Sequence, residues 1–218
     1  MKKGWLSWSS GKDSAWTLHQ LRQQGNYQIT GLFTTLNQVF DRVAIHAVRR
    51  SLLKKQARAV GLPLRLISLP WPCSNAQYER IMDETWLAAV DSGVTAIAFG
   101  DLFLNDIREY RVKQLKGTSL EPIFPLWNLP TSALAEQMID SGVRAKLTCV
   151  DPKQLDGGFA GRDFDFSLLA DLPPGVDPCG ENGEFHSFAY QGPMFHHPLE
   201  VRVGEIVKRD GFVFADLV

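Results

Sequence analysis

Cysteine is scarce in this chain, and its few copies are far apart. The 218 residues include three, Cys73, Cys149 and Cys179, and no two of them form a C-x-x-C pair. Small disulfide-stapled proteins have denser, paired cysteines, and structural zinc sites need close cysteine or histidine pairs, so the sequence argues against both classes. The cysteine usage instead predicts a protein of the reducing cytoplasm.

Long apolar runs, internal repeats and an excess of either charge are also absent. After Met1 the chain soon enters a predicted strand, and no apolar stretch approaches the length of a secretory core or a membrane span, so we expect no membrane partner. The 23 Lys and Arg against 24 Asp and Glu give a formal charge of −1. This balance does not favour nucleic acid as a partner, although it leaves a local basic groove open.

Hydrophobic residues are plentiful enough for a folded core. They make up 44% of the sequence, and 218 residues suffice for one large domain or two small ones. The chain is therefore expected to fold without disulfide staples.

The most informative segment is residues 9–14 (SSGKDS), which lies between a predicted strand at 4–9 and a predicted helix at 13–21. The first N–H groups of a helix have no partner within the helix, and Gly11 allows the backbone to approach a ligand closely. Lys12 adds a full positive charge. The segment is therefore predicted to bind an anion such as phosphate; the alternative is a Ser/Gly turn that only caps the helix.

The residues of this segment also indicate which kind of phosphate loop it is. The P-loop of the common NTPases reads G-x-x-x-x-G-K-[ST], whereas here Asp13 follows Gly11-Lys12 and Gly4 is too far back. The segment instead resembles the PP-loop S-G-G-K-D-S of the N-type ATP pyrophosphatases, which implies cleavage of ATP between its alpha and beta phosphates. Ser10 stands where that pattern has its first glycine, and a serine serves there if its backbone dihedrals are ordinary.

Strands alternate with helices through the first half of the chain. The apolar spacing predicts strands at 27–36, 64–69 and 94–99 and helices at 44–60 and 75–90. Strands that are apolar on both faces and alternate with helices are typical of a parallel sheet covered by helices. The sequence thus predicts an α/β fold.

The topology of such a sheet places a second set of residues beside the loop. In an open doubly wound sheet, ligands bind at the carboxyl ends of the strands where the strand order reverses. If the strands at 4–9 and 94–99 are neighbours there, Gly100 and Asp101 face the same crevice as residues 9–14. Asp101 is then a candidate to bind magnesium or ribose, and the alternative is a cap for the helix that follows.

The second half of the chain has a mixed pattern. A charged helix is predicted at 104–116, a further helix at 131–140, a strand at 144–150 and a terminal hairpin of 199–207 with 212–218. We place a domain boundary near residue 120, between a loop-bearing domain of residues 1–120 and a smaller mixed α+β domain of residues 121–218.

Residues 177–187 (DPCGENGEFHS) concentrate ionisable side chains in one turn-rich stretch. In a starting strand, Glu184 and His186 lie on one face and Phe185 on the other. A carboxylate beside an imidazole orients a nucleophile or accepts its proton, so the segment is a candidate catalytic loop; the alternative is a solvated acidic turn. Cys179 is interpreted as a buried inert thiol rather than a nucleophile, because no basic partner is visible beyond His186.

Several segments together resemble the diphthine–ammonia ligase family of ATP pyrophosphatases, over nearly the whole chain. They are residues 9–14, His46 and Arg49 in IHAVRR, Gln56 with Gly61-Leu62-Pro63, FGDLFLNDIREYR at 99–111, Pro125-Leu126-Trp127, and residues 177–187. The resemblance implies a Rossmann-like parallel sheet of the adenine nucleotide alpha hydrolase (HUP) type with a smaller C-terminal domain. Residues 1–120 would then bind ATP, and residues 121–218 would bind the substrate.

The same resemblance implies a carbon–nitrogen ligase reaction. A carboxylate attacks the alpha phosphate of ATP, pyrophosphate leaves, and ammonia displaces AMP to give an amide. ATP and Mg²⁺ are the implied cofactors, with ammonia and a carboxylate acceptor, either a small molecule or a protein side chain, as the other partners. The sequence identifies neither the acceptor nor the ammonia source, and it leaves a homodimer open.

The resemblance and the loop chemistry together give candidate site residues in four groups. The predicted catalytic residues are Lys12, Asp13, Glu181, Glu184 and His186. The predicted nucleotide-binding residues are Ser9, Ser10, Gly11, Lys12, Asp13, Ser14, His46, Gly100 and Asp101. The predicted acceptor-binding residues are Arg108, Arg111 and Asn182, and the predicted metal ligands are Asp13 and Asp101.

Two other functions stay open on the sequence alone. One is a PP-loop enzyme of tRNA modification or sulfur transfer, which the charge balance and the lack of cysteine pairs disfavour; the other is an adenine-nucleotide-binding module without turnover. His46 fits a helix cap as well as a nucleotide contact. The adjacent His196 and His197 point to opposite faces of an extended segment, which favours surface residues over a metal pair.

Overall fold

A computed structural model describes residues 1–43 and 48–218 of the chain. Its first sheet, sheet A, contains β1 (Lys2–Ser7), β2 (Tyr27–Asn37), β3 (Arg42–Val43), β4 (Leu64–Leu69), β5 (Ala96–Ala98) and β6 (Glu121–Ile123). The second, sheet B, contains β7 (Arg144–Val150), β8 (Phe185–Gln191), β9 (Val203–Arg209) and β10 (Phe212–Leu217). The helices are α1 (Lys12–Gln24), α2 (Arg50–Val60), α3 (Asn75–Asp91), α4 (Asn105–Leu115), α5 (Thr131–Asp140), α6 (Phe166–Asp171) and the short 3-10 helix η1 (Gly157–Phe159).

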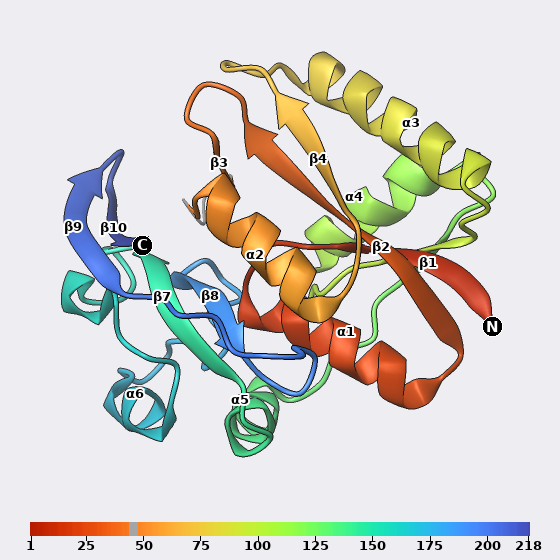
Figure 1. The fold of residues 1–218 in the computed structure, drawn as a ribbon. Helices are drawn as coiled ribbons and strands as arrows, with labels where there is room; N and C mark the ends of the chain where they lie inside the picture. The colour runs from red at the N-terminus through yellow and green to blue at the C-terminus, as the bar shows by residue number, and fades with distance from the viewer. Residues whose placement is uncertain (44–47) are drawn as a thin grey trace.

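Sheet A has the strand order of a doubly wound fold. Five strands run parallel in the order β4-β2-β1-β5-β6, and the short β3 pairs antiparallel with β2 beyond the end of β1. The chain moves outward from β1 to β2 and β4, then returns through α3 to β5 on the other side of β1 (Figure 1). The strand order therefore reverses between β1 and β5, as the sequence predicts, and the α/β class is confirmed.

Helices cover both faces of sheet A, and each face has its own apolar cluster (Figure 1). α1 and α2 cover one face, where Leu18 and Leu53 are fully buried. α3 and α4 cover the other, where Trp86 packs edge-on against Phe33 and Leu115 belongs to the same cluster. Apolar strands thus lie between two helical layers, which is the arrangement that their two-sided hydrophobicity predicts.

Sheet B packs against the α1 and α2 side of sheet A. Its strands are all antiparallel, in the order β8-β7-β10-β9. One continuous apolar cluster extends from α1 and α2 into sheet B and α5, and Ala189 N in β8 donates to Ser10 O at 2.9 Å. The change of sheet falls between β6 and β7, while the division into two domains at residue 120 stays a prediction.

Most predicted elements are present, and the departures have local causes. β4, α5 and β7 have the predicted bounds. The predicted helix at 44–60 is wrong at its start, because α2 begins at Arg50; residues 44–47, which include His46, lie outside the described residues. β6 is not predicted because Pro122 within it cannot donate a sheet hydrogen bond. Among the described residues, no helix has the length and apolar character needed to cross a membrane.

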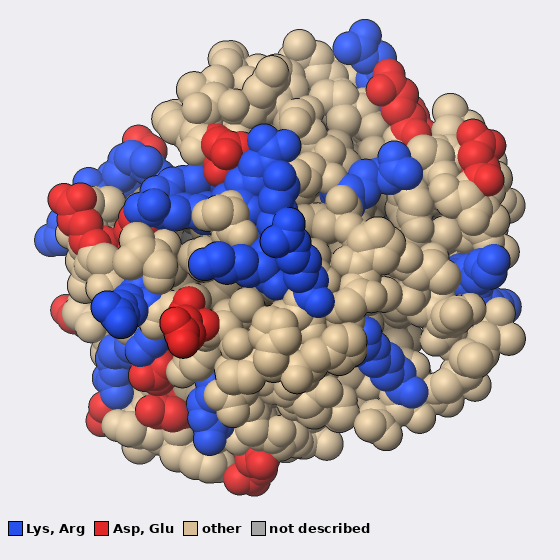
Figure 2. All heavy atoms as spheres, viewed as in Figure 1, with Lys and Arg blue, Asp and Glu red and all other residues tan. Residues whose placement is uncertain are grey.

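Charge is unevenly spread over the surface. Residues 42–78 carry seven of the 23 Lys and Arg side chains and none of the 24 Asp and Glu side chains. Figure 2 shows Lys and Arg gathered over α2. The near-zero net charge of the chain therefore conceals a basic face on this helix.

Candidate active site

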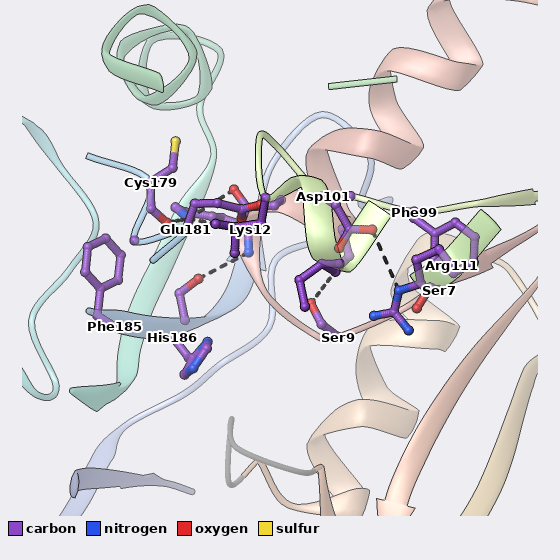
Figure 3. Close-up of a pocket in the computed structure, with 17 residues that line it drawn as sticks. Ser7, Ser9, Lys12, Phe99, Asp101, Arg111, Cys179, Glu181, Phe185 and His186 are labelled. Carbon is purple, nitrogen blue, oxygen red and sulfur yellow. Dashed lines mark hydrogen bonds and ion pairs between the residues drawn. The ribbon is translucent and has the colours of Figure 1, made fainter. Parts of the chain in front are cut away.

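A pocket of about 270 Å³ lies at the edge of sheet A where β1 and β5 end. Three stretches that are far apart in the sequence form it: the segment from β1 into α1, the segment from β5 into α4, and residues 177–187 at the start of β8 (Figure 3). The pocket therefore joins the two motifs, residues 9–14 and residues 177–187, that the sequence singles out.

Ser10 holds the loop in a strained turn. Its φ is 74°, in the left-handed region that favours glycine. Its side chain is fully buried, and its hydroxyl has no hydrogen-bond partner in the described part of the chain. The expectation that a serine serves here if its backbone dihedrals are ordinary is therefore not met. Ser10 adopts a left-handed backbone conformation that suits the glycine of the PP-loop pattern, at a cost of about 1 kcal/mol.

Replacing Ser10 with glycine is expected to raise the free energy of unfolding by about 1 kcal/mol. Glycine adopts the left-handed backbone without a Cβ clash and removes an unpaired buried hydroxyl, and these gains exceed the entropy cost of about 0.5–1 kcal/mol for a glycine in the unfolded chain. Urea unfolding measures the change, with Ser10→Ala as a control that removes the hydroxyl and keeps the strain. A Ser10→Gly protein less stable than both would contradict this account.

Hydroxyl groups surround the first turn of α1. Ser9 Oγ accepts from Gly11 N at 3.3 Å and donates to Ser14 Oγ at 3.1 Å. Ser187 Oγ, from β8, accepts from Lys12 N at 3.2 Å. Backbone N–H groups at a helix start attract oxygen ligands, especially anionic ones. Sheet B thus supplies a hydroxyl to the loop through Ser187, which sequence reasoning missed.

Lys12 is buried in the pocket wall, with 1% of its surface exposed. Its Nζ donates to both carboxylate oxygens of Asp13, at 3.0 and 2.9 Å, and to Cys179 O at 2.5 Å. The same atom lies 5.2 and 5.4 Å from the ring centres of Phe164 and Phe185. Burial on its own would lower the pKa of the Lys12 ammonium, but the Asp13 carboxylate raises it above its ordinary value. Lys12 therefore stays charged and ties the loop to the C-terminal half of the chain.

Asp101 and Arg111 face each other in the pocket without a close contact (Figure 3). Arg111 Nε lies 3.8 Å from Asp101 Oδ2, and both atoms are buried with no hydrogen-bond partner among the described residues. Burial raises the pKa of Asp101. The N-cap of α4 is Leu104, so the interpretation of Asp101 as a helix cap is wrong. A buried carboxylate oxygen that accepts no hydrogen bond is suited to a cation or to a donor group of a ligand.

Glu181 links the C-terminal motif to the segment after β5. Its Oε1 accepts from Leu102 N at 2.7 Å and from Phe103 N at 3.4 Å, while its own N donates to Asp177 Oδ2 at 2.9 Å. Burial raises the pKa of Glu181 to about 7, although the Leu102 amide acts to lower it. The carboxyl group is therefore close to half protonated at neutral pH.

Glu184 and Asn182 shape the motif from within. Glu184 is 2% exposed, and its Oε1 accepts from Asp177 N at 2.9 Å and from Asn182 Nδ2 at 3.0 Å. Cys179 is also buried, its Sγ lies 3.5 Å from Thr131 O, and burial raises the pKa of its thiol. The protonated thiol agrees with the interpretation of Cys179 as inert.

The structure brings together most of the predicted site residues. Those that line the pocket are Ser9, Lys12, Asp13, Ser14, Gly100, Asp101, Arg111, Glu181 and His186. Those that lie outside its lining are Ser10, Gly11, Arg108, Asn182 and Glu184, and His46 belongs to the residues that are not described. Arg108 instead stacks on Phe124 and Trp127, with its guanidinium carbon 5.3 and 4.9 Å from the ring centres. His196 and His197 are exposed.

The fold and the pocket are those of an α/β protein with a PP-loop-like segment at the edge of its parallel sheet. A Ser-Gly-Lys loop lies at the point where the strand order reverses, and its lysine is at the start of the following helix. Residues 130–215 match the family described as "Diphthamide synthase C-terminal domain".

Several known proteins are similar to this chain over most of their length. The chain is 26% identical over 229 residues to proteins named diphthine–ammonia ligase from Bos taurus and Homo sapiens, an overlap that covers 95% of this chain and 85% of each relative. A protein of that name from Danio rerio is 24% identical over 230 residues, or 89% of its length. The chain is therefore similar to proteins of this name over nearly its whole length.

One solved structure also shows a likeness to the chain. It is described as a predicted subunit of tRNA methyltransferase from Methanocaldococcus jannaschii. The match covers 66% of this chain and 77% of that one, with a TM-score of 0.42 and 14% sequence identity.

Proposed function

We propose that this protein is an ATP-dependent carbon–nitrogen ligase, which adenylates a carboxylate acceptor with release of pyrophosphate and then transfers the acyl group to ammonia. One observation carries the proposal: Lys12 of the loop donates to Cys179 O of the C-terminal motif, so both motifs face one pocket. The name of the relatives, diphthine–ammonia ligase, supports ligase chemistry and makes a carboxylate of the diphthine type the first acceptor to test.

The loop side of the pocket is suited to stabilise a departing pyrophosphate. Attack at the alpha phosphate moves negative charge onto the leaving group, and preorganised positive groups lower the barrier to such a step. Lys12 supplies a buried charge, and the start of α1 supplies backbone N–H groups and the positive end of the helix dipole. Asp13 holds the Lys12 ammonium in place through both carboxylate oxygens.

A magnesium ion would fit beside this loop. In phosphate sites Mg²⁺ is commonly held by one or two carboxylates together with the phosphates. The buried Asp101 Oδ2 has no hydrogen-bond partner among the described residues, so Asp101 with Asp13 meets that requirement. Bound there, the ion would offset negative charge on the phosphates.

The opposite side of the pocket is proposed to receive the acceptor. Residues 177–187 contribute Glu181 and His186 to the lining, and α4 contributes the guanidinium of Arg111, whose charge attracts a carboxylate. Glu184 and Asn182 act indirectly in this proposal, because they hold the motif in shape. On this basis residues 1–120 bind ATP, and residues 121–218 supply most of the acceptor side.

Pyrophosphate release tests the proposed reaction. The purified protein is incubated with ATP, Mg²⁺ and ammonia, with and without a set of carboxylates that includes a diphthine-bearing protein, and pyrophosphate and AMP are measured. We expect one acid to stimulate both products in equal amounts, together with an amide. Release of phosphate instead of pyrophosphate, or no stimulation by any acid, would rule the proposal out.

Glu181→Gln is expected to remove part of the pH dependence of stability between pH 4.5 and 7. The pKa of Glu181 rises from 4.5 to about 7 on folding, so in this range the folded protein binds more protons than the unfolded chain. The free energy of unfolding of the wild type should therefore fall as the pH rises through this window and level off above it. Urea unfolding at pH 5 and pH 8 measures the change, and an equal change in the Glu181→Gln protein would contradict the assignment.

A further inference from the structure

The buried face of α2 contains one side-chain amide. Leu52, Leu53, Ala57 and Val60 make most of this face, and Gln56 lies among them with 0% of its surface exposed. An amide that leaves water without new partners is strongly destabilising. Gln56 therefore needs hydrogen-bond partners inside the protein, and the structure shows three.

Two of these partners belong to the segment between β1 and α1, and the third belongs to β8. Gln56 Oε1 accepts from Trp8 Nε1 at 2.9 Å. Gln56 Nε2 donates to Ser10 O at 2.9 Å and to Ala189 O in β8 at 2.5 Å. Ser10 O accepts a second hydrogen bond, from Ala189 N at 2.9 Å. Both donated hydrogens of the amide are thus used on carbonyl groups, one in the loop and one in sheet B.

Fixing Ser10 O also fixes the direction of the next N–H group. In a trans peptide the carbonyl and the following N–H point in opposite directions. Because Ser10 O points toward Gln56 and β8, Gly11 N points the other way, toward Ser9 Oγ, which lines the pocket. A rotation of the peptide between Ser10 and Gly11 would turn that N–H group away from the pocket.

The turn at Ser10 needs such a restraint. Its φ of 74° is unfavourable for a residue with a side chain, so the backbone gains energy by leaving this conformation. Strained backbone persists only where the surrounding structure holds it. The two hydrogen bonds on Ser10 O, from Gln56 and Ala189, hold this peptide.

We propose that Gln56 is a positioning residue of the proposed nucleotide loop: it holds the Gly11 N–H group on Ser9 Oγ, a residue that lines the pocket, and makes that arrangement depend on sheet B through Ala189. This inference rests on one part of the proposed function, the binding of ATP in the pocket. It adds a residue of α2 that touches neither ATP nor the acceptor, and whose effect passes through the Ser10 peptide. A purely packing role would affect stability without any selective effect on the loop.

The test compares Gln56→Met with Leu53→Ala. Gln56→Met keeps an unbranched side chain of similar length but removes the amide group. Leu53→Ala truncates another buried side chain of α2, one that makes no hydrogen bond to the loop. Thermal unfolding first establishes that each variant is folded. The dissociation constant for ATP with Mg²⁺ is then measured by calorimetry. We expect about a tenfold increase for Gln56→Met, the worth of one or two hydrogen bonds, and a change of less than about twofold for Leu53→Ala.

Ser10→Gly supplies a rescue that a packing role would not give. Glycine adopts the left-handed turn without strain, so the loop needs less restraint, and the double variant Ser10→Gly/Gln56→Met is expected to recover most of the lost affinity. The combination Ser10→Gly/Leu53→Ala should show only additive effects. Equal losses of affinity in Gln56→Met and Leu53→Ala, or no rescue by Ser10→Gly, would overturn the proposal.

A readout without nucleotide separates this inference from the proposed function. The amide resonance of Gly11 in ¹H–¹⁵N spectra of the free protein should shift in Gln56→Met and stay in place in Leu53→Ala. If the methionine variant does not fold, Gln56→Glu, which keeps an acceptor for Trp8 and lacks both donated hydrogens, takes its place. A wild type that binds no ATP would refute the proposed function alone, while an unmoved Gly11 resonance in the folded variant would refute the positioning role.

Discussion

Replacing Lys12 with methionine is expected to lower the rate of ATP-dependent pyrophosphate release by about 10²- to 10³-fold. The methionine side chain occupies a similar volume but removes the charge that the loop directs at the departing pyrophosphate. Lys12 is 1% exposed and held by Asp13 and Cys179 O, so its ammonium group is fixed in the pocket wall. Initial rates at saturating ATP measure the loss.

Lys146→Met is the matched control. Lys146 also makes an ion pair with an aspartate, since its Nζ lies 2.8 Å from Asp163 Oδ2, but it belongs to β7 and is not part of the pocket lining. We expect its loss to change the rate by less than about twofold, because a partly exposed ion pair contributes about 0–1 kcal/mol. Comparable rates for the two variants would show that the charge of Lys12 does not contribute to pyrophosphate release.

Gly180→Ala is expected to destabilise the protein by about 2–4 kcal/mol and to abolish turnover. A Cβ at this position would lie 2.8 Å from Phe185 O, a backbone atom, and 3.0 Å from the Phe185 ring. The φ of Gly180 is 71°, which adds the left-handed penalty of about 1 kcal/mol to the cost of overpacking. Gly180 follows Cys179, whose carbonyl accepts from Lys12, so relief of the clash also displaces that contact.

Gly183→Ala separates the cost of the left-handed backbone from the cost of the clash with Phe185. Gly183 also has a positive φ, 86°, but no heavy atom lies within 4 Å of the position of an added Cβ. Its replacement is therefore expected to cost only about 1 kcal/mol. Chemical unfolding of the two variants in parallel gives the difference, and equal losses would mean that the contact with Phe185 carries no energy.

Most strands of sheet A can be predicted from the sequence because the patterns that indicate them lie within short segments. The apolar runs that form β4 and β5 and the helical spacing of α3 lie within short stretches of sequence, and the reversal between β1 and β5 follows from the rules of parallel sheets. Short elements were harder. β6 has three residues and a proline, and α6 has six residues, so neither gives a periodic pattern.

The immediate surroundings of Lys12 could not be predicted from local patterns. Phe164 has no motif around it, yet its ring lies 5.2 Å from Lys12 Nζ because the packing of sheet B brings it there. Ser187 ends a segment that was singled out, but its contact with Lys12 N joins residues 175 positions apart. Contacts of this kind depend on how the two sheets pack, which no periodicity in one segment encodes.

Glu184 is a residue that the sequence identifies as special but whose role the sequence does not predict. Its place in a dense acidic motif favours a catalytic carboxylate, and the structure instead buries it against Asp177 N and Asn182 Nδ2. Composition identifies the motif as special but does not distinguish a side chain that faces ligand from one that holds the loop. Burial and hydrogen bonds make that distinction.

The apolar cluster that α1 and α2 share with sheet B limits how the molecule can move and evolve. A hinge opening between the sheets would expose these buried side chains to water, so ligands are expected to enter through the existing mouth of the pocket. A change of side-chain size on the faces of α1 and α2 that pack against sheet B would likewise require a matching change in sheet B, so these surfaces are expected to vary together.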